Sequence, residues 1–258
     1  MKTVILAGGY GTRISEETAT RPKPMVEVGG RPILWHIMKL YSFYGLNDFV
    51  VCLGYKGYLI KEYFANFFLH HSSVTFDFRT QKTTIHEQHV EPWSVTLVDT
   101  GESTQTGGRL KRAARYLDNE TFCFTYGDGL ADVNIPLLLD FHRRQGTKAT
   151  LTAVNQPGRY GAVSIGTDRR IKLFKEKPQG EDSWINGGFF VLEPSVLDYI
   201  AGDATGWEHE PLEKLSAEKE LSAFQHSGFW LPMDTLRDKM KLEDLWASNQ
   251  APWKVWAD

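Results

Sequence analysis

The chain has 258 residues, of which 41% are hydrophobic and 24% are charged, and its formal net charge is -3. This composition is typical of a folded globular protein rather than a disordered one, and the small net charge excludes a general attraction to nucleic acid or to an anionic membrane. No apolar run approaches the ~18 residues of a membrane span and the start of the chain lacks a signal-peptide core, so we expect a cytoplasmic protein.

The first part of the chain, residues 1–147, alternates strand and helix patterns. Strands are predicted at 3–6, 49–53, 95–98 and 122–126, and helices at 32–44, 57–68, 108–117 and 136–145. Pro32 suits the first turn of its helix and Gly45 suits the end. The alternation predicts an α/β protein with a mostly parallel central sheet flanked by helices.

Beyond Thr147 the strand patterns become shorter and are interrupted by Pro, Gly and Asp. They lie at 149–154, 162–165, 171–174 and 188–192, and helices are predicted at 194–200, 211–219 and 235–248. We therefore expect mixed strand pairing in this part. Because no repeat or linker divides the chain, we predict a single domain over residues 1–258.

Two cysteines, Cys52 and Cys123, each lie in an apolar strand pattern. No CxxC-type spacing is present, so buried free thiols are favoured over a disulfide or a zinc pair.

A glycine-rich segment, Leu6-Ala7-Gly8-Gly9-Tyr10-Gly11-Thr12-Arg13, follows the first predicted strand. Backbone that approaches a phosphate closely cannot carry Cβ atoms, and the three glycines allow that approach while Arg13 adds a positive charge. A Rossmann fingerprint starting at Gly9 would need glycine at position 14, which is Ile14, and the Gly-Lys-Ser/Thr of a Walker loop does not follow. Without further context, a plain structural turn is an equal alternative.

Three charged residues in turns are further candidates. Lys23 lies between two prolines that restrain its backbone, which would aim its ammonium, although a surface lysine is the alternative. Asp128 follows an apolar strand at its carboxyl end, where ligands of open α/β sheets gather; a turn aspartate is the alternative. Asp234 precedes a predicted helix, so metal ligation and helix N-capping compete for its side chain.

The strings LAGGxGTR and RPKPMVEVGGRPIL, taken together, resemble the signature of the sugar-nucleotide pyrophosphorylase family. The resemblance implies a Rossmann-like nucleotidyltransferase fold, with a nucleotide-binding half at about 1–147. A smaller mixed-strand half that binds the sugar phosphate, with the C-terminal helices, would occupy about 148–258. It also implies in-line attack of a sugar 1-phosphate on a nucleoside triphosphate, assisted by Mg²⁺, with Asp128 and Asp234 as the metal ligands.

The same resemblance assigns the other site residues. It implies nucleotide binding by Leu6, Ala7, Gly8, Gly9, Tyr10, Gly11, Thr12, Arg13, Lys23, Thr104, Gly108, Arg109 and Asp128. It implies sugar-phosphate binding by Tyr160, Gly161, Glu176, Lys177 and Asn186, in which Glu176 accepts hydrogen bonds from sugar hydroxyls and Lys177 holds the phosphate. The residues that would act in catalysis are Arg13, Lys23, Asp128 and Lys177.

Longer strings, namely GYKGYLIKEYFANFFLH, VEPWSVTLVDTG, TGGRLKR, FTYGDG, INGGFFVL and FWLPMDTLRDK, resemble the cytidylyltransferase branch of the family, which makes CDP-glucose for bacterial O-antigens. This branch implies CTP and glucose 1-phosphate as substrates and a homo-oligomer, a hexamer in close relatives. No residue separates cytosine from uracil or thymine, so UTP and dTTP stay open, as does a catalytically silent sugar-nucleotide-binding subunit. The aromatic residues of 57–68 leave core packing and a subunit interface equally open.

Overall fold

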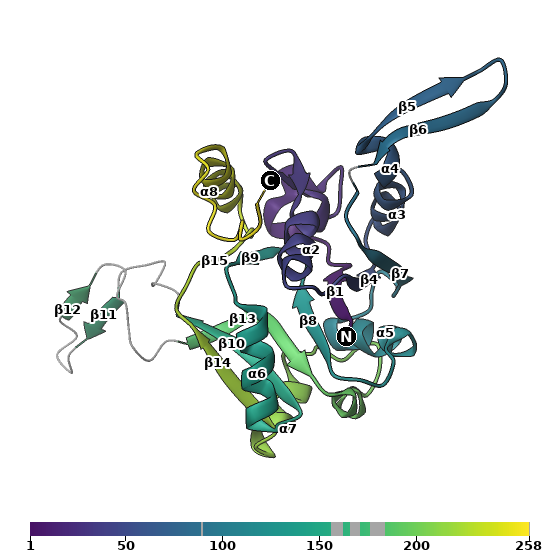
Figure 1. Ribbon diagram of the computed structural model, residues 1–258. Helices are drawn as coiled ribbons and strands as arrows, with labels where there is room; N and C mark the ends of the chain where they lie inside the picture. Colours follow the sequence, from purple (N-terminus) through teal and green to yellow (C-terminus); the bar gives the residue numbers. More distant parts are fainter. Residues whose placement is uncertain (89, 156–161, 166–170, 176–183, 258) are drawn as a thin grey trace.

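The computed structural model in Figure 1 describes residues 1–88, 90–155, 162–165, 171–175 and 184–257. At its centre lies a seven-stranded sheet with the order β14-β10-β13-β8-β1-β4-β7. Its strands are β1 (Thr3–Ala7), β4 (Asp48–Leu53), β7 (Ser94–Asp99), β8 (Phe122–Tyr126), β10 (Ala149–Asn155), β13 (Trp184–Leu192) and β14 (Leu221–His226). Only β13 runs against the other strands of this sheet, so the prediction of a mostly parallel sheet is confirmed.

The helices and turns pack around this sheet (Figure 1). The α-helices are α1 (Ser15–Thr18), α2 (Ile33–Phe43), α3 (Gly57–Ala65), α4 (Phe67–His70), α5 (Thr106–Ala113), α6 (Ile135–Gln145), α7 (Glu210–Ala217) and α8 (Leu236–Ala247). The 3₁₀ turns are η1 (Thr12–Ile14), η2 (Lys23–Met25), η3 (Ala114–Tyr116) and η4 (Pro194–Tyr199).

Buried side chains form one apolar layer on each face of the sheet. Ile5 of β1 packs in the layer that contains α2 and α6, whereas its neighbours Val4 and Leu6 pack in the layer that contains α5. Side chains alternate along a strand, so a strand buried on both faces is apolar at nearly every position, as β1 is from Val4 to Ala7. The central strand is thereby fixed from both sides, and the loop that follows it has a rigid base.

Four two-stranded ladders lie outside the main sheet. They are β2 (Glu27–Val28) with β3 (Arg31–Pro32), β5 (Ser72–Asp77) with β6 (Lys82–Gln88), β9 (Gly129–Ala131) with β15 (Trp230–Pro232), and β11 (Ala162–Ile165) with β12 (Ile171–Lys175). In the third ladder Gly129 pairs with Pro232, and the Met233 amide donates to the Asp128 carbonyl at 2.8 Å. This short ladder brings Asp128 next to Asp234, although the two are distant in sequence.

Several predicted elements differ from those observed. The predicted helix 57–68 is divided into α3 and α4, because Asn66 between them leaves helical geometry at φ -100° and ψ 7°. Pro32 is extended and pairs in β3, so α2 begins one residue later, and the predicted helix 194–200 is the 3₁₀ turn η4. The β5–β6 hairpin was not predicted, and it projects away from the body of the molecule (Figure 1).

Both thiols lie where the sequence predicts them. Cys52 and Cys123 are buried and unbridged, and burial raises the pKa of each to about 12. Within the described ranges, no helix is long and apolar enough to cross a bilayer.

Candidate active site

The glycine segment after β1 forms one wall of a cavity of about 650 Å³ at the carboxyl edge of the parallel strands. A Cβ atom built on Gly8 would lie 2.1 Å from Arg109 Nη1, and Gly11 has φ +63°, so both positions require glycine. A side chain on Gly9 would instead enter open space. Within the described residues, no backbone acceptor meets the amides of Gly9, Tyr10 and Gly11, so these amides are available to an anion.

Lys23 lies in η2 and its ammonium joins the two predicted carboxylates. Its Nζ donates to Asp128 Oδ2 at 2.7 Å and to Asp234 Oδ1 at 2.9 Å, while Lys23 itself is only 9% exposed. Burial alone would lower the pKa of Lys23, but its ion pairs with the two aspartates outweigh burial and raise that pKa above its ordinary value. The lysine therefore carries its charge at neutral pH.

Asp234 does not cap α8. Thr235 is the N-cap: its hydroxyl accepts from the Asp238 amide, and the Asp238 carboxylate accepts from the Thr235 amide in a capping box. The Asp234 carboxylate instead accepts from Lys23, and from Arg13 Nη1 at 3.1 Å. Because the cap is provided by the next residue, the Asp234 side chain faces the cavity.

Arg109 of α5 is buried and holds the far wall of the cavity together. Its guanidinium donates to the carbonyl oxygens of Leu53 at 3.0 Å, Gly101 at 2.8 Å and Glu102 at 2.9 Å, and to the Thr100 hydroxyl at 2.8 Å. Burial lowers the pKa of Arg109 from its ordinary value. These bonds join the end of β4 to the loop after β7, which fixes the loop residues that line the cavity.

The family model for nucleotidyl transferases matches residues 2–250. The chain belongs to the nucleotidyl transferase family. The family predicted from the glycine segment and its neighbours is therefore confirmed.

Individual members of the nucleotidyl transferase family resemble the chain over its full length. The glucose-1-phosphate cytidylyltransferase of Salmonella typhimurium is 62% identical over 257 residues, which is 99% of this chain and 100% of that protein. A probable glucose-1-phosphate cytidylyltransferase of Bacillus subtilis is 45% identical over the same shares of the two chains. The crystal structure of a putative glucose-1-phosphate thymidylyltransferase from Bacillus anthracis has a TM-score of 0.70 at 18% identity, covering 100% of this chain and 98% of that one. At that identity the likeness shows the fold alone.

The cavity of this nucleotidyl transferase gathers most of the predicted site residues. Those that line it are Leu6, Gly8, Gly9, Tyr10, Gly11, Thr12, Arg13, Lys23, Thr104, Arg109, Asp128, Asn186 and Asp234. Ala7 and Gly108 do not line it. The Gly108 amide donates to the Thr205 carbonyl, and a Cβ there would lie 2.6 Å from Asp203, so this glycine has a packing role beside the nucleotide role, which stays a prediction. Tyr160, Gly161, Glu176 and Lys177 lie outside the described residues.

Sequence reasoning missed a polar network at the other end of the cavity. The Tyr126 hydroxyl donates to Glu208 Oε1 at 2.6 Å, and Asn186 Nδ2 donates to the Tyr126 hydroxyl oxygen at 3.3 Å. Burial and the Glu208 carboxylate raise the pKa of Tyr126 far above its ordinary value, so it remains a neutral donor. Glu208 carries no sequence signal, whereas Tyr126 lies two residues before the predicted Asp128 and could have been found there.

Proposed function

We propose that the chain transfers a cytidylyl group from CTP to glucose 1-phosphate, giving CDP-glucose and pyrophosphate. The observation that carries the reaction type is the buried Lys23 ammonium held between Asp128 and Asp234, opposite the unpaired amides of the glycine segment. Such a cavity can bind a triphosphate together with a positively charged ion that balances it. The choice of base and sugar is supported by the full-length relatives that are cytidylyltransferases.

The residues present fit a Mg²⁺ ion. Magnesium is usually held by one or two carboxylates together with substrate phosphates, and Asp128 and Asp234 are two adjacent carboxylates at the cavity. Within the described part of the chain, no three His, Cys, Asp or Glu side chains form a complete metal cage, which suits an ion that shares its ligands with a substrate. When bound, the ion supplies positive charge that offsets the repulsion between the two phosphates.

The chain's own residues bind and orient the reactants. The amides of Gly9, Tyr10 and Gly11 and the Arg13 guanidinium hold the triphosphate, and the Lys23 ammonium neutralises charge near the α-phosphate. A phosphate oxygen of glucose 1-phosphate attacks the α-phosphorus in line. The bond from that phosphorus to the oxygen bridging the β-phosphorus breaks, and pyrophosphate leaves with the electron pair. Rate acceleration comes from positioning and charge, so no protein nucleophile is needed.

The sugar side of the cavity is proposed in less detail. Glu208 holds the Tyr126 hydroxyl, which accepts in turn from Asn186, and both polar groups line the cavity and suit hydrogen bonding to sugar hydroxyls. The predicted roles of Glu176 and Lys177 are part of the proposal and can be tested by substitution.

A pyrophosphate-release matrix tests the reaction. The purified chain is supplied with CTP, UTP, dTTP, ATP or GTP, each with several sugar 1-phosphates, in the presence of Mg²⁺ or a chelator. We expect CTP with glucose 1-phosphate and Mg²⁺ to give the highest kcat/KM. Faster turnover of another nucleotide would refute the cytidylyl assignment, and no turnover of any pair would refute the transferase reaction itself.

We further propose a homo-oligomer, a hexamer, located in the cytoplasm. Tyr58 of α3 is 72% exposed and Phe68 of α4 is 49% exposed, and large apolar side chains at a surface are typical of an interface. Light scattering on the purified chain measures the assembly mass against the 29.4 kDa of one chain. A mass equal to one chain would refute the oligomer.

A further inference from the structure

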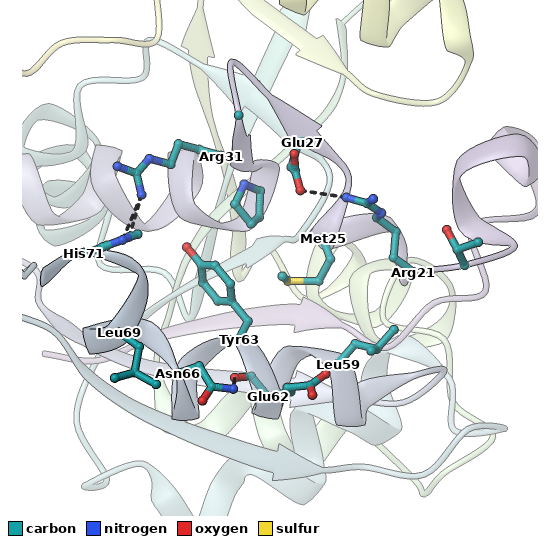
Figure 2. Close-up of a pocket in the computed structure, with 13 residues that line it drawn as sticks. Arg21, Met25, Glu27, Arg31, Leu59, Glu62, Tyr63, Asn66, Leu69 and His71 are labelled. Carbon is teal, nitrogen blue, oxygen red and sulfur yellow. Dashed lines mark hydrogen bonds and ion pairs between the residues drawn. The ribbon is translucent and has the colours of Figure 1, made fainter. Parts of the chain in front are cut away.

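A second cavity, of about 820 Å³, lies beside the turn that carries Lys23, since Arg21 and Met25 line it (Figure 2). Its lining comes from the β2–β3 hairpin, from α3 and α4, and from the segment before η2. The nucleotidyl transfer site uses none of these lining residues. A cavity of this size is large enough for a metabolite.

Arg31 provides a positive charge at one end of the second cavity. The Arg31 guanidinium donates to His71 Nε2 at 2.6 Å and lies over the Trp35 ring at 5.3 Å. In the described residues no carboxylate pairs with Arg31, whereas Arg21 at the opposite end pairs with Glu27 at 2.8 Å. An arginine that has an aromatic face beneath it and no carboxylate paired with it suits an incoming oxyanion, which it can bind with two parallel hydrogen bonds.

Tyr63 of α3 adds a hydroxyl without a partner to the same end. Its oxygen is buried and, in the described residues, has no hydrogen-bond partner, although a buried hydroxyl normally has one. Figure 2 shows this hydroxyl directed toward the place where Arg31 and His71 meet. Burial raises the pKa of Tyr63 to about 12, so the phenol keeps its proton and can donate it to an acceptor in the cavity.

The remaining wall is apolar. Met25, Leu59 and Leu69 line the cavity beside this polar end, and Leu69 at the rim is 41% exposed. A ligand that fits both parts has an anionic head and an apolar or planar body. We propose that this cavity binds a small organic phosphate monoester as an effector, with the phosphate at Arg31, Tyr63 and His71.

The effector role follows from the turn that the two cavities share. Arg21 and Met25 line the second cavity, while Lys23, between them in sequence, lines the first. The turn is short and hydrogen bonded: the Met25 amide donates to the Pro22 carbonyl at 2.8 Å and the Val26 amide to the Lys23 carbonyl at 3.0 Å. A ligand that packs on Met25 restrains this turn, and a restrained Lys23 loses less conformational entropy when the triphosphate binds. The apparent KM for CTP should therefore fall.

Phenyl phosphate, inorganic phosphate and benzoate are suitable probes of binding. Calorimetric titrations of the CTP-saturated chain should give one phenyl phosphate site, with weaker binding of the other two. Tyr63→Phe removes only the hydroxyl and should weaken phenyl phosphate severalfold, whereas Leu69→Glu puts a negative charge at the rim and should weaken it about tenfold or more. Arg31→Ala should weaken binding of phenyl phosphate at least as much as Leu69→Glu does. Arg143→Ala, on the exposed face of α6, is the matched control. Binding that survives the first two variants, or equal binding of benzoate, overturns the proposed site.

The effector role is tested by a separate measurement. That measurement rests on the proposed reaction, whereas the titration does not. In pyrophosphate-release assays, phenyl phosphate should lower the apparent KM for CTP about twofold or more, and Tyr63→Phe should reduce this effect while leaving the basal KM unchanged. If phenyl phosphate binds at the second cavity and the KM for CTP stays the same, the effector role is overturned. If no reaction occurs with CTP, the titration still decides whether the site exists.

Discussion

The two cavities on either side of η2 balance their charges in different ways. In the first, the Lys23 ammonium meets two carboxylates and Arg13 pairs with one of them, so the positive charges are compensated before any substrate arrives. In the second, Arg31 contacts an imidazole and an aromatic ring. The first arrangement keeps its positive charges in ion pairs until the substrate binds, whereas the second is arranged to gain a charge from its ligand.

The supports of the two cavities differ as well. The first is held by the carboxyl ends of buried parallel strands, and by Arg109, which ties β4 to the loop after β7. The second depends on the small β2–β3 hairpin, whose Val28 carbonyl accepts from the buried imidazole of His36. We therefore expect substitutions at the first cavity to have the largest effect on turnover. A change of pH should instead alter the stability of the fold through His36, which supports the hairpin beside the second cavity.

The largest effect is expected from Asp128→Asn, which keeps the shape of the side chain but removes its charge. Pyrophosphate release should fall at least about a thousandfold, because the proposed metal ligand and a partner of Lys23 are lost together. Lys23 retains Asp234, so the circular dichroism spectrum should be unchanged. Asp140→Asn, on the exposed face of α6, is the control and should keep full activity. Near-normal release from the Asp128 variant would contradict its assigned role.

His36 offers the next largest effect, on stability rather than turnover. Burial lowers the pKa of His36 to about 4, since the imidazole is enclosed by α2, the hairpin and Trp253. Above pH 6.5 both states hold a neutral imidazole. Between pH 6.5 and 4 the unfolded chain takes up a proton that the native state refuses, so the free energy of unfolding should fall by up to about 3 kcal/mol.

Urea unfolding at pH 7 and pH 5 measures about 2 kcal/mol of this loss, because pH 5 lies about 1.5 units below the ordinary histidine pKa. The His36→Gln variant should be less stable than the parent at pH 7, because packing around the imidazole is disturbed, but it should lose less stability between the two pH values. Equal losses in both proteins would show that another group causes the pH dependence. The activity of His36→Gln at pH 7 then tests whether the hairpin influences the first cavity. Among the described residues, the His36 imidazole makes hydrogen bonds only to Val28 and Trp253, which do not line that cavity, so any change in activity would act through the hairpin.

Local patterns were enough to predict the main sheet except its edge strand β14, and half of the site. The alternation of apolar strands and helices yields β1, β4, β7 and β8 within one or two residues of their observed ends, since each has a run of apolar residues. The glycine segment and Lys23 were recognisable because a close backbone approach and a proline-restrained lysine are encoded by adjacent residues.

Tertiary pairing explains what the sequence could not provide. The β9 and β15 strands have three residues each, too few for a periodic pattern, yet their ladder places Asp128 beside Asp234. The need for glycine at Gly8 arises partly from Arg109, which approaches from a distant helix. Glu208 lies in a loop without any motif and becomes significant only through its bond to Tyr126.

The smallest expected effect tests whether the cap of α8 positions Asp234. Thr235→Ala removes the hydroxyl that accepts from the Asp238 amide, which should cost about 1 kcal/mol of stability. Because Asp234 is the residue before the cap, its carboxylate should also lose some of its alignment with Lys23, and kcat/KM should fall about two- to fivefold. Asn134→Ala provides the matched control: Asn134 caps α6, away from the cavity, by accepting from the Leu137 amide at 3.1 Å. Both variants should lose similar stability in urea unfolding, but only the first should lose activity. Equal activities would mean that the ladder between β9 and β15 positions Asp234 without help from the helix cap.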